Sequence, residues 1–323
     1  MNKKFRNFVI FTTIYNIFVI IWGAFVRATG SGAGCGRHWP LCNGEVIPMA
    51  NSLHTQIEFF HRLTSGLSLP LVLWISYHGL KIFPKNSAGR GFSLIAGVSI
   101  IVEALIGAGL VLFELVSHNQ SLKRTISMAL HFSNTLVLMA SLVLLACFTL
   151  RGSNHQYFWK HHSLRRPVIM FTTLFAALGM AGAITALGDT LFPAQSLSQG
   201  FQADWDVASH FLVRLRIIHP ILALTFVLFF APWAHSLMHQ LKSSEIFIRG
   251  RLAITLLVIN IFLGTLNLYW LAPVGLQLIH LFFGVLVWIS FIIFIEGLLS
   301  HRADHIQSLQ TQTSTQGLEY KKN

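Results

Sequence analysis

Long apolar stretches alternate with short polar ones along the whole chain. Runs long enough to cross about 30 Å of hydrocarbon, at about 1.5 Å per helical residue, occur at 8–26, 56–80, 92–115, 125–149, 167–188, 211–233, 251–271 and 275–298. This pattern predicts an all-α integral membrane protein with eight transmembrane helices.

The composition agrees with this prediction. Hydrophobic residues make up 54% of the 323 residues and charged residues only 11%, and the mean hydropathy is positive. A chain of this kind is not expected to fold in water.

Lys and Arg residues gather in every second connecting segment, which indicates the orientation. With a cytoplasmic N-terminus, the inner segments hold most of the 23 basic residues: Lys3, Lys4, Arg6, Lys81, Lys85, Arg90, Arg151, Lys160, Arg165, Arg166, Lys242, Arg249, Arg251, Arg302, Lys321 and Lys322. We therefore expect both termini in the cytoplasm. Attraction to anionic lipid accounts for the net charge of +12, so membrane lipid is an expected partner and nucleic acid is not.

The basic start of the chain could also belong to a signal peptide, and Cys35 to a lipoprotein site. However, the first apolar run is long enough to span, and Arg27 interrupts it before the cysteine. We expect the first helix to be retained. Because no Arg-rich and Ser-rich transit segment precedes it, the bacterial inner membrane is favoured over an organelle.

The chain has three cysteines, two of which lie close together in GCGRHWPLC, within the predicted outer loop 27–55. An oxidising compartment would allow Cys35 and Cys42 to form a disulfide, either structural or redox-active. Two independent thiols are the alternative. Cys147, near the inner end of the fourth run, is expected to be a small buried hydrophobe.

The two halves of the sequence resemble each other. WGAFVRATG matches AGAITALGD, HTQIEFFHRLT matches SHFLVRLRIIHP, VEALIGAGL matches INIFLGTLN, and SMALHFSN matches LQLIHLFFG. This repeat predicts two four-helix bundles related by a pseudo-two-fold axis along the membrane normal. The halves would cover 1–150 and 167–300, with a cytoplasmic linker at 151–166 and a polar cytoplasmic tail at 301–323.

The repeat selects one histidine in each of four helices, all at a similar depth below the outer surface: His61, His131, His219 and His280. Each could merely hydrogen-bond a neighbouring helix. Zinc would require further ligands. Two facing imidazoles per bundle are what a six-coordinate heme iron needs, so we expect one heme in each half.

Arginines near the outer ends of the helices could bind the heme propionates through bidentate contacts. Arg27 and Arg62 lie near the first histidine pair, and Arg214 and Arg216 near the second. The alternative for each is a side chain that extends to the membrane interface.

The two predicted heme sites differ in charge. Glu58 lies three residues before His61, whereas the equivalent position before His219 is Arg216. This favours a reactive first site and a carboxylate-free second site with a structural or electron-transfer role. Glu103, equivalent to Asn260, is a second candidate acid and is expected to be hydrogen-bonded and neutral.

Together, the Glu58-x-x-His61-Arg62 signature, GAFVRATGSG, the two outer-loop cysteines, the four histidines and the duplication resemble the heme A synthase family. The resemblance covers nearly the whole chain. It implies oxidation of the C8 methyl group of heme O to a formyl group, which gives the heme A of terminal oxidases.

The resemblance also implies roles for individual residues. His61 and His131 would ligate the iron of the substrate heme O, His219 and His280 that of a heme b cofactor, and Glu58 would be the catalytic carboxylate. Heme O synthase and the terminal oxidase assembly are the implied protein partners.

The chain departs from part of the family in its cysteines. Some members carry a second cysteine pair between helices five and six, but DTLFPAQSLSQGFQADWD has none, so an electron relay through both pairs is in doubt.

Two other functions fit part of the same pattern. A di-heme transmembrane cytochrome b that exchanges electrons with quinone would use the same histidines. A transporter with parallel repeats would share the duplication.

Overall fold

The computed structural model describes residues 3–49, 52–151 and 162–319, and the side chains of the last helix as far as His301. The elements are α1 (Lys3–Ala28), η1 (Ser31–Ala33), α2 (Leu53–Ile82), α3 (Ala88–Leu112), α4 (Leu122–Arg151), α5 (His162–Leu191), α6 (Leu197–Trp205), α7 (Phe211–Arg214), η2 (Leu215–Ile217), α8 (Ile218–Gln240), α9 (Ser244–Tyr269) and α10 (Val274–Glu319). Each of the predicted apolar runs lies on helix, except for its last residues at 113–115 and 270–271.

Within the described ranges, seven helical stretches are long and apolar enough to cross a membrane. They comprise α1, α3, α4, α5, the α7–α8 segment, α9 and the part of α10 up to His301. The 30-residue α2 is not among them, because Glu58, Arg62 and other polar residues dilute its apolar character. The chain is therefore confirmed as an all-helical, multi-pass membrane protein.

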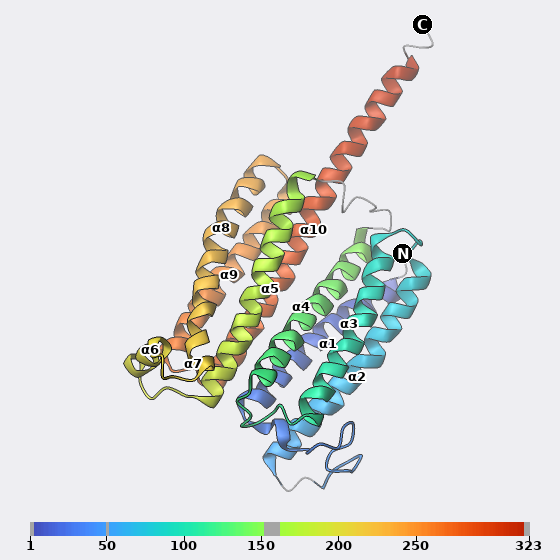
Figure 1. Ribbon diagram of the computed structural model, residues 1–323. Helices are drawn as coiled ribbons and strands as arrows, with labels where there is room; N and C mark the ends of the chain where they lie inside the picture. Colours follow the sequence, from blue (N-terminus) through green and yellow to red (C-terminus); the bar gives the residue numbers. More distant parts are fainter. Residues whose placement is uncertain (1–2, 50–51, 152–161, 320–323) are drawn as a thin grey trace.

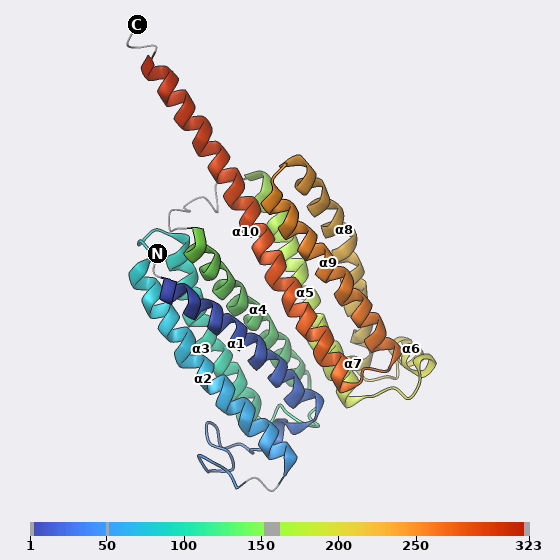
Figure 2. The same cartoon turned by 180° about the vertical axis from the view of Figure 1, so that it is seen from behind.

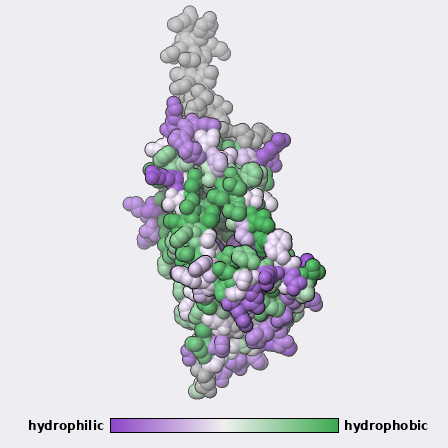
Figure 3. Space-filling view, turned by 90° about the vertical axis from the view of Figure 1, so that its left-hand side faces the viewer, coloured by the Kyte–Doolittle hydropathy of each residue, from purple (hydrophilic) through white to green (hydrophobic). Residues whose placement is uncertain are grey.

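The long helices form two groups, α1 to α4 and α5 with α8, α9 and α10 (Figures 1 and 2). The two termini lie at one end of the molecule, whereas the loop after α1 and the short helices α6 and α7 lie at the other. Apolar side chains gather in a band across the middle, and polar ones lie toward the ends (Figure 3).

Serine residues begin several of these helices. The hydroxyl groups of Ser52, Ser87, Ser196 and Ser243 each accept a hydrogen bond from the backbone N–H three residues later. Such caps satisfy one of the free N–H groups in the first helical turn. Ser196 starts α6, a helix that the apolar pattern did not predict, and Ser243 starts α9.

The sixth predicted run is divided into α7, η2 and α8. The break lies next to Pro220, which has no N–H to donate to the carbonyl of Arg216, four residues earlier. That carbonyl instead lies 3.4 Å from the Thr185 hydroxyl, which donates to it from α5. The short 3-10 turn places His219 within the first turn of α8.

Small residues and buried polar contacts hold neighbouring helices together. A Cβ atom on Gly97 of α3 would collide with Ser76 of α2, and Ser68 donates to Asn16 of α1 at 2.7 Å. Between the groups, the indole N–H of Trp288 on α10 donates to the carbonyl of Leu136 on α4 at 2.9 Å. In lipid, where apolar surface gains little by association, such contacts fix helix positions.

The last helix differs in length from its prediction. The apolar run ends at 298, but α10 continues to Glu319 and has 46 residues. Part of the predicted polar tail is therefore helical. Most of the predicted linker at 151–166 lies outside the described residues.

A buried ion pair joins α9 to α10 near the end of the molecule that carries the termini. Arg249 donates to Glu296 at 2.8 Å and to the carbonyl of Ile293 at 2.9 Å, and the Glu296 side chain is 1% exposed. Ser300 donates to the other carboxylate oxygen at 2.7 Å. The guanidinium therefore balances a carboxylate that water hardly reaches.

Replacing Arg249 by Met should lower the thermal unfolding midpoint in detergent. Leaving Glu296 buried without this cation is expected to cost about 3–5 kcal/mol. The double variant Arg249→Met/Glu296→Leu should recover most of the loss, because no buried charge remains. Circular dichroism on heating tests both variants, and an equally unstable double variant would contradict the ion-pair explanation.

Candidate active site

The two histidines of the C-terminal group face each other. His219 on α8 and His280 on α10 have ring centroids 6.0 Å apart and planes at 82°. When two imidazoles bind one metal ion from opposite sides, each ring centre lies about 3 Å from the metal, because the metal–nitrogen bond is about 2 Å long and the nitrogen is about 1 Å from its ring centre. The two ring centroids are then about 6 Å apart. At this spacing both rings could bind one metal ion placed between them.

Neighbouring helices determine which ring nitrogen of this pair can bind a metal. The Nδ1 atom of His219 lies 3.2 Å from the carbonyl oxygen of Leu178 on α5, and that of His280 lies 3.1 Å from the carbonyl oxygen of Asn260 on α9. Because a carbonyl can only accept, each Nδ1 carries the proton. The lone pair is then on Nε2, the nitrogen left for iron.

The N-terminal pair is held differently. The Nδ1 atoms of His61 on α2 and His131 on α4 are buried and make no hydrogen bond in the described part of the structure. An oxygen of Glu103 lies 3.2 Å from Nδ1 of His131, but not in hydrogen-bond geometry. No hydrogen bond to Nδ1 therefore fixes the orientation of these rings, in contrast to the C-terminal pair.

Each histidine ring also lies next to a glycine of an adjacent helix. A Cβ atom added to the glycine would lie 2.9 Å from Cε1 of His61 at Gly23, 2.9 Å from Cε1 of His219 at Gly182, 2.8 Å from Cε1 of His280 at Gly264, and 3.8 Å from Cε1 of His131 at Gly107. These glycines were missed in the sequence analysis. The signal was present, because WGAF aligns with AGAI and LIGAGL with FLGTLN in the repeat.

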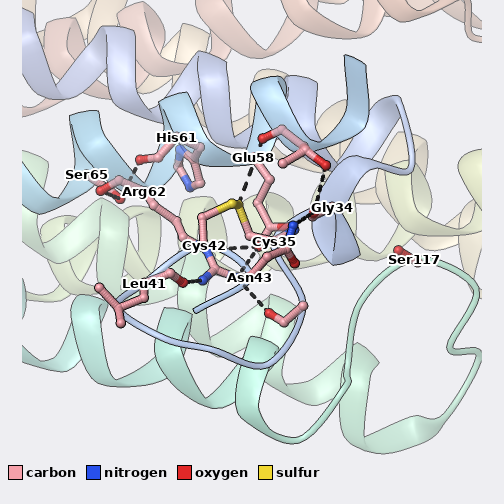
Figure 4. A network of polar contacts seen from close by, with 12 residues as sticks. Gly34, Cys35, Leu41, Cys42, Asn43, Glu58, His61, Arg62, Ser65 and Ser117 are labelled. Atoms are coloured by element: carbon pink, nitrogen blue, oxygen red, sulfur yellow. Dashed lines mark hydrogen bonds and ion pairs between the residues drawn. A yellow bond between two sulfur atoms is a disulfide. The ribbon is translucent and has the colours of Figure 1, made fainter. Parts of the chain in front are cut away.

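Glu58 is buried beneath the loop between α1 and α2, with 2% of its surface exposed. One carboxylate oxygen accepts the backbone N–H of Cys35 at 2.7 Å. The other accepts two N–H groups of Arg62, at 3.1 and 2.6 Å. Figure 4 shows both side chains reaching from α2 to the loop that carries the cysteines.

The predicted disulfide is confirmed, since the sulfur atoms of Cys35 and Cys42 are bonded. Arg62 holds the closed loop by donating to the carbonyls of Gly36, at 2.9 Å, and Leu41. The chain at Gly34 passes so close to α2 that a Cβ atom there would collide with the backbone of His54. Cys147 is buried, as predicted.

Arg27 connects the two helix groups. Its guanidinium donates from α1 to the carbonyl of Ala186 at 2.6 Å and to the hydroxyl of Thr190 at 2.7 Å, both on α5. It also donates to the side chain of Gln277 on α10 at 3.0 Å. The sequence placed Arg27 near the first histidine pair but did not indicate these partners on α5 and α10.

The arginines of the C-terminal group occupy different environments. Arg216 forms ion pairs with Asp189 at 3.1 Å and Asp204 at 2.9 Å, so the expectation of a carboxylate-free second site is wrong. Asp189 lies near the end of α5, and Asp204 lies in α6. The comparison of the two halves did not identify either acid as a partner of Arg216. Arg214 is exposed and lines a cavity of about 420 Å³ with Trp205.

Glu103 is hydrogen-bonded, as expected for a lone intramembrane acid. The side-chain amide of Asn134 donates to one carboxylate oxygen at 2.5 Å, and the hydroxyl of Thr135 donates to the other. Both donors come from α4, within one turn of His131.

Comparison with known proteins shows the family of the chain. Residues 6–292 match the COX15-CtaA family, described as cytochrome oxidase assembly protein. This chain belongs to that family. The resemblance noted in its sequence motifs is thereby confirmed.

Individual family relatives add detail. The chain is 28% identical over 295 residues to a heme A synthase from Bacillus licheniformis, covering 88% of this chain and 92% of that protein. It is 39% identical over 160 residues to a heme A synthase from Shouchella clausii, covering 48% and 49%. It is 38% identical over 303 residues to a protoheme IX farnesyltransferase from Thermus thermophilus, covering 91% of this chain and 48% of the relative. The chain thus spans about half the length of the Thermus relative.

The disulfide predicts a simple labelling pattern for this family member. When the protein is denatured without reductant and treated with a maleimide, only Cys147 should react, because Cys35 and Cys42 are bonded to each other. Mass spectrometry after proteolysis identifies the labelled sites. A reduced sample serves as the control and should be labelled at all three cysteines, whereas full labelling without reductant would exclude the disulfide.

Proposed function

We propose that this chain is a heme A synthase, which oxidises the C8 methyl group of heme O to a formyl group and so supplies heme A to terminal oxidases. The observation that carries the proposal is the unequal treatment of the two histidine pairs. Backbone carbonyls orient both rings of the C-terminal pair, whereas both Nδ1 atoms of the N-terminal pair are buried without a hydrogen bond in the described part of the structure. Glu58, one turn before His61, is buried as well.

The C-terminal pair suits a resident heme b. His219 and His280 would ligate its iron through Nε2, and their fixed Nδ1 contacts would keep both rings in place. Bound there, heme supplies one-electron redox chemistry. The chain's own contribution is to orient the two imidazoles and to leave space between α8 and α10.

The N-terminal pair suits a substrate that must arrive and leave. His61 and His131 would hold the iron of heme O, and Glu58, one turn from His61, would act on the reacting edge as a proton acceptor or by stabilising positive charge. Hydrogen bonds from Arg62 and Cys35 position both oxygens of this carboxylate. The disulfide loop covers it and limits the access of water.

Four arginines are proposed as propionate contacts: Arg27, Arg62, Arg214 and Arg216. An arginine has five N–H donors, so one that already binds the protein can still hold a carboxylate. Arg62 and Arg216 already donate to acceptors of the protein through most of these groups, so each would give a propionate a single hydrogen bond.

The arrangement in the membrane follows from the same proposal. We infer that α2 is an eighth span, because it lies alongside α1 and α3 (Figure 1), and that the halves 1–150 and 167–300 are related by a pseudo-two-fold axis. The disulfide loop and α6 would face outward and the termini the cytoplasm of a bacterial cell. Heme O synthase and the terminal oxidase assembly are the proposed partners.

Replacing Glu58 by Gln should reduce heme A formation by about a hundredfold or more, within the range contributed by a positioned acid or base. Shape and iron ligation are retained, so heme O or a partly oxidised product should accumulate on the protein. Chromatography of pigment extracted from membranes supplied with heme O measures both. His61→Ala should differ by weakening substrate binding itself.

The control for this test is Glu45→Gln, which makes the same change in an exposed residue of the loop that covers Glu58 and should leave the yield of heme A unchanged. Wild-type yields from Glu58→Gln would show that the carboxylate is only structural. If the wild-type protein itself carried only unmodified heme, the proposed synthase would be replaced by a transmembrane cytochrome.

Replacing Gly182 by Ala should displace the His219 ring, since the new methyl group would lie 2.9 Å from Cε1. We expect the resident heme to become high-spin or to be lost, with affinity reduced about tenfold or more. Gly66→Ala is the matched control, because no atom lies within 4 Å of a Cβ atom there. Absorption spectra of the purified variants decide, and an unchanged low-spin spectrum for Gly182→Ala would refute the proposed ligand pair.

A further inference from the structure

The four histidines differ in the group that faces Nδ1. Backbone carbonyls accept from His219 and His280. His131 instead has a carboxylate oxygen of Glu103 3.2 Å from Nδ1, without the direction of a hydrogen bond. His131 is thus next to an acceptor that its ring does not yet use.

The ring of His131 has room to turn toward that acceptor. At the three other histidines an added glycine Cβ would come within 2.9 Å of the ring, but at Gly107 the distance to His131 is 3.8 Å. The His131 side chain is 26% exposed and that of Glu103 18%. A small rotation about the Cβ–Cγ bond is therefore not opposed by the glycine next to it.

The carboxylate, in contrast, is held in place. Asn134 donates to one oxygen at 2.5 Å and is itself anchored by donating to the carbonyl of Ser99 at 2.8 Å. The Thr135 hydroxyl contacts the oxygen that faces His131 and also lies 2.9 Å from the carbonyl oxygen of His131, so these two acceptors share its one proton. Because both donors are on α4 and Glu103 is on α3, the acceptor and the ring keep a constant separation.

We propose that Glu103 is a positioning residue for His131. When substrate heme binds, the imidazole turns so that its Nδ1–H donates to Glu103, which orients Nε2 toward the iron and makes the ring a stronger ligand. This inference rests on the proposed N-terminal substrate site. The contact can form and break with each substrate molecule, unlike the backbone contact that Asn260 makes at the equivalent position.

Binding and redox measurements test the role of Glu103 without turnover. Protein that carries its resident heme is titrated with ferric protoporphyrin IX in detergent, and the second equivalent is followed by difference absorption. Glu103→Gln should weaken this binding by about 10- to 100-fold. In the heme-bound state Glu103 acts as a carboxylate, in contrast to the neutral form expected from the sequence. Glu103→Gln should therefore also raise the midpoint potential of the second heme, because a neutral acceptor favours ferric iron less than a carboxylate does.

A second variant separates positioning from mere charge. Thr135→Val keeps the carboxylate but removes the hydroxyl that shares its oxygen with His131, so the oxygen becomes a better acceptor and the midpoint potential should fall. Glu114→Gln, an exposed acid just after α3, is the matched control and should change neither quantity.

The outcomes are distinguishable from failure of the proposed function. Equal affinity and equal potential in wild type and Glu103→Gln would overturn the role of Glu103 alone. A Thr135→Val potential that shifts in the same direction as that of Glu103→Gln would also overturn it. Failure of the wild-type protein to bind a second heme would instead refute the N-terminal substrate site.

Discussion

Imidazole rings need space inside a helix bundle that is otherwise closely packed, and a glycine on the neighbouring helix provides it. At Gly23, Gly182 and Gly264 a methyl group would press on a histidine ring. The glycines therefore determine how close α1 comes to α2, α5 to α8 and α9 to α10 at the depth of the histidines. The spacing of 6.0 Å between His219 and His280 depends on this close approach.

The lipid environment sets the second condition, which is that buried polar groups must find partners within the protein. The molecule meets it in different ways at its two ends. Near the termini, Arg249 and Glu296 neutralise each other. At the opposite end, Glu58 is satisfied by Arg62 and by the backbone of the disulfide loop, so the same contacts both stabilise the loop and orient the proposed catalytic group.

Much of this arrangement was predictable, and the exceptions have physical causes. Apolar runs and the repeat located the long helices, the histidine positions and the cysteine pair, because these depend on local pattern and on chain symmetry. The partners of Arg27 and Arg216 were not predictable, since they depend on how helices far apart in sequence pack. The division before α8 reflects a lost backbone donor at Pro220, and α6 depends on a serine cap and has little apolar character.

The contacts of Arg27 have a consequence for the order in which the protein is made. Its hydrogen-bond partners follow it by 159, 163 and 250 residues in the chain. While the ribosome is still producing the middle of the protein, the first helix must therefore hold a guanidinium whose final acceptors do not yet exist. The C-terminal end of α1 can reach its native environment only after α5 and the start of α10 have been inserted, which makes completion of the second half a condition for maturation of the first.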